Sequence, residues 1–333
     1  MKIHIEKTVV LSLVLATLIS CNSGNKTNTN STESTSAIQT TSWDNSYGGT
    51  DKAYDTTLLK LREEIAPNFK TLEFKDDITG KTMTYNLFIP KNYDKTKSYP
   101  LVQFIADAST VGKGAVAPLK QGYGGIIWAT DESQEENPCF VLVPSFAGPD
   151  WAVNDKHETS DEVAISFRLL NKIIKDYSID KNRIYTTGQS MGGMISFYLN
   201  ATYPDFFAAS IFVGSQWDIN VLKPLAKKNF FYIVSAGDEK ASSGMKEVGN
   251  LLTEMGVKYG STEFSAKLPQ AEQDKKVEDL IKEGYAINFV QFTPKTVTPE
   301  GISEKGAPEH MYSFDYAYQL KPVRDWLFNQ RKM

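Results

Sequence analysis

Cysteine is almost missing from this chain, which contains only Cys21 and Cys139 among its 333 residues. Cys139 lies in the apolar run NPCFVLVPS, where a small buried hydrophobic side chain is the expected role, ahead of a nucleophile or a metal ligand. Cys21 is expected to carry a lipid, for the reasons given below. The remaining domain would then have one thiol and no disulfide.

An excess of positive charge is also absent. The chain has 36 Lys and Arg against 40 Asp and Glu, and no basic stripe is visible. A nucleic-acid partner is therefore disfavoured. The sequence shows neither a cluster of metal-ligating residues nor a phosphate-binding loop, so we expect no metal and no other cofactor. The composition, 41% hydrophobic and 23% charged, is that of an ordinary globular protein.

Long hydrophobic runs are missing too, except at the N-terminus. Lys2 and Lys7 precede an apolar run over 9–19, which is too short for a spanning helix and typical of a secretory signal. The run ends in Leu-Ile-Ser-Cys and resembles the lipobox of bacterial lipoproteins. That resemblance implies a signal peptide over 1–21, a lipidated Cys21 (palmitate among its acyl chains) and an extracytoplasmic, membrane-anchored protein. A plain signal peptide or an uncleaved anchor is the alternative.

The rest of the chain divides into two parts. Residues 22–51 are rich in Asn, Ser, Thr and Gly and offer little to bury, so they are expected to form a disordered tether. Residues 52–331 show neither a repeat nor a second linker and are read as one domain.

The domain has the pattern of an α/β fold with a mostly parallel sheet. Runs at 72–76 and 82–90 flank a Gly-containing turn and predict an antiparallel hairpin. Nearly continuous apolar runs predict strands buried on both faces, at 99–107, 139–145, 183–188, 209–214, 230–237 and 287–293. Helical patterns lie between several of them, and the clearest runs over 159–177 with Thr159 and Glu162 as a capping box. Strands alternating with helices indicate a sheet covered on both faces, here with an antiparallel N-terminal edge.

One motif carries chemistry. Gly188-Gln189-Ser190-Met191-Gly192 has the form G-x-S-x-G and lies between a predicted strand and a predicted helix. This is the arrangement of a nucleophile elbow, in which the serine occupies a strained turn and small neighbours let strand and helix pack closely. The N–H groups at the start of the helix favour negative charge that develops near the serine.

A serine nucleophile needs a base and an acid. Of the three histidines, His4 lies in the expected signal and His157 precedes the serine, whereas the order in this architecture is serine, acid, histidine. His310 is therefore the candidate base. Asp238 directly follows a late strand and is the candidate acid, with Asp218 as the second choice. The other acidic residues considered are expected to be structural or solvated, namely Asp205, Asp274 and Asp279.

The run from about residue 82 to 332 resembles the prolyl-oligopeptidase-related α/β-hydrolases, in particular secreted esterases and peptidases similar to feruloyl esterases. The similarity lies in YNLFIPKNYDKTKSYPLV, NPCFVLVPS, RIYTTGQSMGG, YPDFFAA and the terminal HMYSFDYAYQLKPVRDWLF. It also includes GD-x-KA-x-x-GM, which begins at Gly237. The resemblance implies that Ser190, Asp238 and His310 are nucleophile, acid and base.

The chain departs from that family at the turn after strand 99–107. Relatives carry His-Gly where this chain has Ala106-Asp107. By resemblance, the backbone N–H groups of Asp107 and Met191 would form the oxyanion hole. A carboxylate that faces the oxyanion would oppose it, so Asp107→Gly is expected to raise the rate if the Asp107 carboxylate does so.

Three candidate substrate contacts lie beside the serine or after strand ends: Gln189, Trp151 and Trp217. Ligands bind at strand ends in open α/β sheets, although plain packing is an equal alternative for both tryptophans. We therefore expect a serine esterase that acts through an acyl-enzyme on a small or polysaccharide-linked ester. The alternatives are a serine peptidase of the prolyl oligopeptidase type and a non-catalytic surface-binding lipoprotein.

Overall fold

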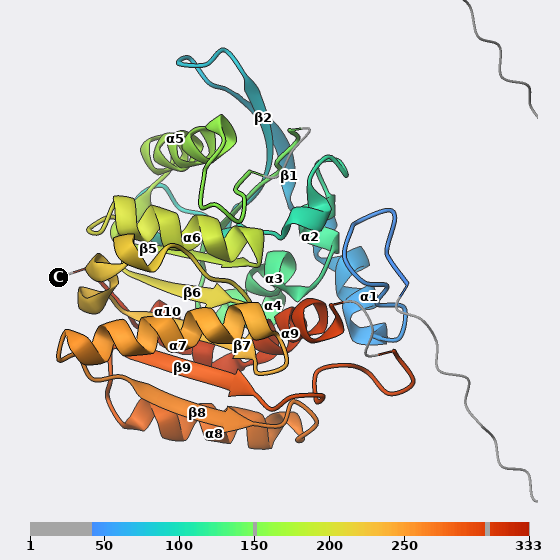
Figure 1. Cartoon of the computed structure of the whole chain (residues 1–333). Coiled ribbons are helices and arrows are strands. Elements are labelled where there is room, and N and C mark those ends of the chain that lie inside the picture. The colour runs from blue at the N-terminus through green and yellow to red at the C-terminus, as the bar shows by residue number, and fades with distance from the viewer. Residues whose placement is uncertain (1–41, 149–151, 304–306, 333) are drawn as a thin grey trace, which may run out of the picture. The chain divides into compact units, whose positions relative to one another are not determined.

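The computed structural model describes residues 42–148, 152–303 and 307–332 (Figure 1). These residues form a nine-stranded sheet in the order β1-β2-β4-β3-β5-β6-β7-β9-β8. The strands are β1 (Lys70–Lys75), β2 (Thr82–Phe88), β3 (Tyr99–Ile105), β4 (Phe140–Pro144), β5 (Ile179–Gln189), β6 (Ala209–Val213), β7 (Phe230–Ser235), β8 (Gly260–Phe264) and β9 (Ile287–Phe292).

The sheet is parallel except at one edge. β1 pairs with β2 and β2 with β4 in antiparallel register, whereas every pairing from β4 across to β8 is parallel. The predicted N-terminal hairpin and mostly parallel sheet are thus confirmed. All residues of β3, β4, β6 and β7 are buried, because helices cover both faces and a strand in that position has no solvent-facing side.

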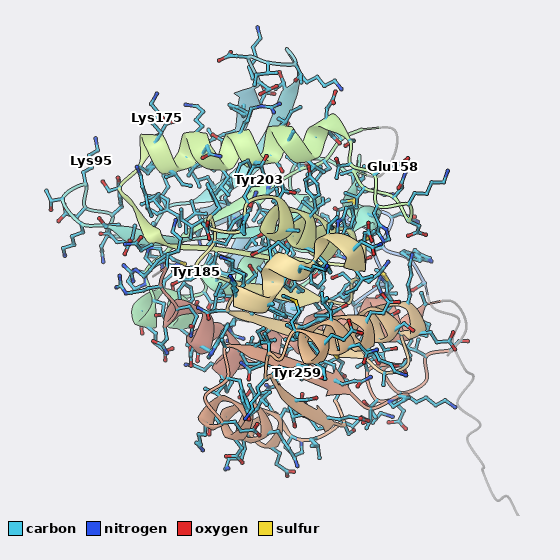
Figure 2. The ribbon with its side chains drawn as sticks, turned by 60° about the vertical axis from the view of Figure 1, so that its left-hand side comes forward. Lys95, Glu158, Lys175, Tyr185, Tyr203 and Tyr259 are labelled. Atoms are coloured by element: carbon cyan, nitrogen blue, oxygen red, sulfur yellow. The ribbon has the colours of Figure 1, made fainter. Side chains whose placement is uncertain are left out.

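Helices form one layer on each face of this sheet (Figure 1). One face packs on α5 (Asp161–Asp176), α6 (Met191–Thr202) and α7 (Glu239–Glu254). The other face packs on α1 (Thr56–Glu64), α2 (Ala117–Lys120), α3 (Tyr123–Ile126), α8 (Gln270–Lys282), α9 (Pro308–Gln319) and α10 (Lys321–Phe328). The short α4 (Asp131–Glu136) precedes β4. In Figure 2, Lys95, Lys175 and Glu158 extend from the periphery, while Tyr185 of β5 lies within the body.

Two local features differ from the sequence-based expectation. β8 was not predicted, because it is a short edge strand that buries only its two end residues and has no continuous apolar run. The predicted capping box of α5 is the second difference, since the structure does not contain it. Ser160 is the N-cap and its side chain makes no capping hydrogen bond. The Glu162 carboxylate accepts hydrogen bonds from the N–H groups of Ala147 and Gly148 instead. Because it is bonded to this loop, it does not bond to the N-cap N–H group as a capping box requires.

The ends of the described chain bear on the predicted domain boundaries. Residues 42–51 belong to the predicted tether, yet Gly48, Gly49 and Thr50 are buried on the domain. The signal, Cys21 and most of the tether lie outside the described residues. Among the residues that are described, no helix is both long enough and apolar enough to cross a membrane.

Cys139 is a buried, unpaired thiol beside the side chain of Gln134. Burial raises the pKa of the Cys139 thiol to about 12, so it remains protonated and inert. The prediction of a buried small hydrophobic residue is confirmed.

Candidate active site

Ser190 occupies the sharp turn between β5 and α6. Its backbone angles are φ 50° and ψ −118°, a left-handed conformation that is costly for a residue with a Cβ. The flanking glycines explain how the turn closes. A Cβ on Gly188 would lie 2.3 Å from the carbonyl carbon of Gly192, and a Cβ on Gly192 would lie 1.9 Å from the carbonyl oxygen of Ile105. Strand, turn and helix pack this closely only because both positions lack side chains.

His310 lies in the first turn of α9 and points at the serine. Its Nε2 is 2.8 Å from Ser190 Oγ, and its Nδ1 is 2.5 Å from Asp238 Oδ2. A carboxylate on Nδ1 holds the proton of the neutral ring there, which leaves Nε2 free to accept the serine proton. The structure therefore brings together three side chains that are 120 and 72 positions apart in the sequence.

Asp238 comes from the carboxyl end of β7, where it is the N-cap of α7. Its Oδ1 accepts a hydrogen bond from Ala241 N–H at 3.2 Å, which leaves Oδ2 for the histidine. The Asp238 side chain is 8% exposed and that of His310 is 25% exposed. The acid is thus shielded from water, while the serine and the imidazole can meet a ligand.

The other residues weighed for these roles lie elsewhere. Asp218 caps a short helical turn and accepts from the N–H and side-chain amide of Asn220. Asp205 pairs with Lys228 at the surface. His157 packs its ring against Trp217, with 5.1 Å between ring centroids.

The turn after β3 does not direct its carboxylate at the serine. Asp107 Oδ1 accepts from the N–H and hydroxyl of Ser109, and Oδ2 accepts from the Gln189 amide at 3.0 Å. The Asp107 side chain thereby caps the short 3₁₀ helix Ala108–Thr110. Among the described residues no hydrogen bond uses the Asp107 N–H. The N–H of Met191 begins α6, where no acceptor exists within the helix.

Comparison with solved structures identifies the fold. No family model matches the chain. A solved thermostable esterase has a TM-score of 0.63 and 22% identity, covering 80% of this chain and 64% of that one. A ferulic acid esterase has a TM-score of 0.52 and 14% identity, covering 78% of this chain and 98% of that one. The protein has the α/β-hydrolase fold.

Sequence similarity to a curated protein covers a smaller part of the chain than these structural similarities do. The chain is 29% identical over 131 residues to a probable feruloyl esterase C of Aspergillus terreus. The match covers 39% of this chain, and it spans less than half of the relative's length, 46%.

A cavity of about 570 Å³ lies beside α7, and neither Ser190 nor His310 is among its lining residues. Its wall contains Trp217, His157 and, directly after Asp238, Glu239 and Lys240. Trp217 is only 5% exposed, because His157 and the ring of Tyr198 pack on it. The prediction that Trp217 contacts substrate stays a prediction, and Trp151 lies outside the described residues.

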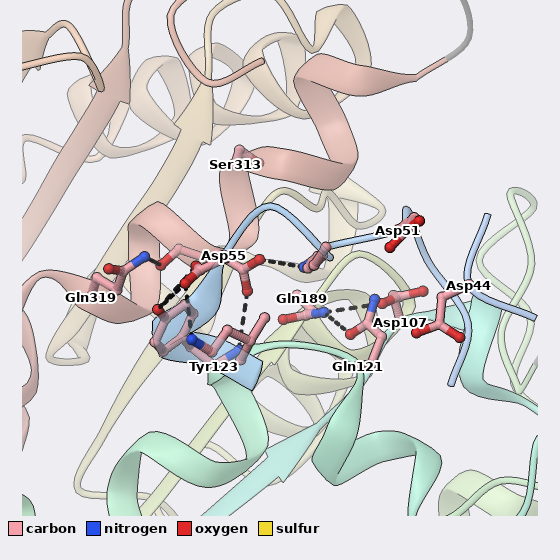
Figure 3. Close-up of polar contacts among 12 residues, drawn as sticks. Asp44, Asp51, Asp55, Asp107, Gln121, Tyr123, Gln189, Ser313 and Gln319 are labelled. Atoms are coloured by element: carbon pink, nitrogen blue, oxygen red, sulfur yellow. Dashed lines mark hydrogen bonds and ion pairs between the residues drawn. The ribbon is translucent and has the colours of Figure 1, made fainter. Parts of the chain in front are cut away.

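Gln189 is buried and hydrogen-bonded to two polar side chains. It is 1% exposed, and its amide donates to Asp107 and, at 2.6 Å, to the side-chain oxygen of Gln121 (Figure 3). The side chain is therefore directed at the turn after β3, and its predicted contact with substrate stays a prediction.

Sequence reasoning missed Glu309, which precedes the histidine. Its carboxylate accepts from the hydroxyl of Ser235 at the end of β7 and, at 2.5 Å, from the N–H of Lys295. The first bond ties the start of α9 to the end of β7, the strand that precedes Asp238, and the second ties it to the loop after β9. The only sequence signal was its position beside His310, since its partners are more than ten residues away.

Proposed function

We propose that this protein is a serine hydrolase that cleaves carboxylic esters through an acyl-enzyme. Ser190 is the nucleophile, His310 the general base and acid, and Asp238 the residue that orients His310. The observation that carries the proposal is the Ser190–His310–Asp238 chain of contacts at the carboxyl end of the sheet. Ligands of open α/β sheets bind at that end.

The mechanism follows from the positions of these atoms. As Ser190 Oγ attacks the ester carbonyl carbon, its proton passes to His310 Nε2 and the carbonyl π electrons move onto the oxygen. When the tetrahedral intermediate collapses, the bond to the leaving alcohol breaks and Nε2 returns the proton to that oxygen. Water then attacks the acyl-enzyme in the same way, and the acid and free Ser190 are released. Asp238 stabilises the imidazolium in both halves.

The backbone donors for the oxyanion are, in this proposal, the N–H groups of Met191 and Asp107. The close approach of Gly192 to the Ile105 and Ala106 carbonyls brings the start of α6 against the end of β3. With its side chain engaged by Ser109 and Gln189, Asp107 contributes to this site through its backbone.

An ester is favoured over a peptide bond because the similar proteins named above are an esterase and feruloyl esterases. We infer that the substrates include aromatic acyl esters such as feruloyl esters. The peptidase and binding-protein alternatives have no comparable support.

The test uses purified protein that lacks residues 1–41. A fluorophosphonate should label it, and it should hydrolyse p-nitrophenyl acetate. A panel of acetyl, feruloyl and longer acyl p-nitrophenyl esters should be cleaved far faster than aminoacyl p-nitroanilides. Amide cleavage at comparable rates would favour the peptidase, and absence of both labelling and hydrolysis would favour the binding protein.

The engaged carboxylate reverses the expectation for Asp107→Gly. Loss of the cap should loosen the 107–110 turn, and full loss of one oxyanion donor costs about 10²–10³ in rate. We expect kcat to fall about tenfold or more while KM changes little, as measured on p-nitrophenyl acetate. Ser109→Ala keeps the Ser109 N–H donor and should have a smaller effect. A rise in kcat for Asp107→Gly would mean that the carboxylate does oppose the oxyanion.

We also propose that the protein is exported and anchored to a bacterial membrane through lipid on Cys21. The support is the charged start, the short apolar run and the Leu-Ile-Ser-Cys sequence. In cells grown with radioactive palmitate, the wild-type protein should be labelled and sediment with membranes. Cys21→Ser should lose the label, and persistent labelling of that variant would contradict a lipid anchor on Cys21.

A further inference from the structure

We propose that residues 42–52, named here the N-terminal strap, are a positioning element of the active site. The strap packs against both the turn that carries the Asp107 N–H and the helix that carries His310. The inference rests on the proposed function, since it concerns how oxyanion donor and base are held. It assigns a catalytic contribution to a segment whose composition is that of a tether.

The strap is closed on itself by backbone hydrogen bonds. Trp43 and Thr50 form an antiparallel bridge. Asp44 N–H donates to the Gly49 carbonyl at 2.9 Å, and Asp51 N–H donates to the Ser42 carbonyl at 2.8 Å. Gly48 and Gly49 both have positive φ angles, 81° and 76°, which the tight return of the chain requires. A segment closed in this way can transmit a fixed position to its neighbours.

The first neighbour is the oxyanion turn. A Cβ on Gly48 would lie 2.3 Å from the carbonyl oxygen and 2.6 Å from the carbonyl carbon of Ser109. The backbone of the strap therefore lies directly against Ser109, which donates two hydrogen bonds to Asp107. Displacing Ser109 would move the cap of the turn and the Asp107 N–H with it.

The second neighbour is the elbow's own polar network. A Cβ on Gly49 would lie 2.7 Å from Gln121 Nε2 and 3.3 Å from the terminal methyl of Met311. Gln121 accepts from Gln189, the residue before the serine, and Met311 directly follows His310. The strap thus contacts Met311, the residue after the base, and Gln121, the hydrogen-bond partner of the residue before the nucleophile.

The third contact is a buried ion pair. Lys52 is 0% exposed and pairs with Asp315 on α9, whose other carboxylate oxygen accepts from Tyr123 N–H at 3.1 Å. At the far side of the strap, Asp44 lies 3.9 Å from Arg62 of α1, and Tyr47 lies under the cations of Arg62 and Lys120. The strap is therefore held at both ends, with α9 as one of its anchors.

The deciding experiment compares two glycines with the same backbone constraint. Gly48 has φ 81°, and a Cβ added there would meet the Ser109 backbone. Gly80, in the β1–β2 turn, has φ 70°, and a Cβ added there would have nothing within 4 Å. Both Gly→Ala variants incur the strain of a positive φ, and only Gly48→Ala pushes on the oxyanion turn. Misplacement by 1 Å costs about 10²-fold in rate, so a shift of about half an ångström in the turn predicts about a tenfold loss.

We therefore expect Gly48→Ala to lower kcat for p-nitrophenyl acetate about tenfold with little change in KM. Its inhibition constant for phenylboronic acid, which binds serine as a tetrahedral adduct, should rise in parallel. Gly80→Ala should match the wild type in both. Partial unfolding alone would reduce the active fraction and leave the inhibition constant unchanged, so an unchanged inhibition constant would overturn the proposal.

A second variant covers a Gly48→Ala protein that fails to fold. Lys52→Met with Asp315→Asn removes the link to α9 without leaving a buried charge, and it should lower kcat and weaken the boronate in the same way. Hydrogen exchange of amides 107–111 should speed up in both strap variants and not in Gly80→Ala. Wild-type kinetics in either variant, or unchanged hydrogen exchange of amides 107–111, would overturn the proposal that the strap positions the active site. A wild-type protein that cleaves no ester overturns the proposed function, and with it the strap's catalytic role.

Discussion

Replacing Ser190 by alanine should lower kcat on p-nitrophenyl acetate by about a million-fold and abolish fluorophosphonate labelling. The hydroxyl that makes the covalent bond is lost, and His310 Nε2, 2.8 Å from that hydroxyl in the wild type, has no proton to accept. In serine hydrolases, loss of the nucleophile costs about 10⁶ in kcat, because the three residues act as a unit. Steady-state release of p-nitrophenol and gel fluorescence of the labelled protein measure the two effects.

The matched control is Ser178→Ala. Ser178 precedes β5 at the end opposite Ser190, and its hydroxyl donates to the Lys95 carbonyl. This variant should keep wild-type activity and labelling. The double variant Ser190→Ala with His310→Ala should be hardly slower than Ser190→Ala alone, because the base has no role without the hydroxyl. Substantial activity or labelling in Ser190→Ala would place the nucleophile elsewhere.

Asp238→Asn should lower kcat by about 10⁴-fold with KM nearly unchanged. Asparagine has almost the shape of aspartate, so the contact with His310 Nδ1 survives sterically. An amide NH₂ facing Nδ1 would, however, place the ring proton on Nε2, and the ring could no longer accept the serine proton. The neutral amide also stabilises the imidazolium less, and a loss of about 10⁴ is the size found when a carboxylate in this role is replaced.

Asp218→Asn is the control for that prediction. Asp218 follows the neighbouring strand β6 and was the second choice from the sequence, but within the described part of the chain its carboxylate accepts from Asn220 alone. The Asp218 variant should keep kcat within about twofold, since the side-chain oxygen of asparagine can still cap the turn. If Asp218→Asn were the more damaging change, the acid would be Asp218 and the described geometry would not be the working one.

Much of the fold was predictable because burial on both faces leaves a plain pattern. Runs such as YPLVQFI and CFVLVP are apolar at nearly every position, and the structure buries all of β3 and β4. The pattern fails where burial is partial. β8 lies at the sheet edge and buries only its end residues, Gly260 and Phe264. The capping box failed for another reason, since Glu162 bonds to loop amides that only the folded chain brings near.

The sequence by itself determined the candidate nucleophile, the candidate base and the fold class. Local spacing decides these: the elbow needs glycines at fixed offsets from Ser190, and the chain order leaves only His310. Only the tertiary structure decided that Asp238 rather than Asp218 meets His310 and that the Asp107 carboxylate caps its own turn. It also decided that residues 42–52 pack against that turn and against α9. These outcomes depend on side-chain direction and on contacts between segments remote in the chain, neither of which a local pattern contains.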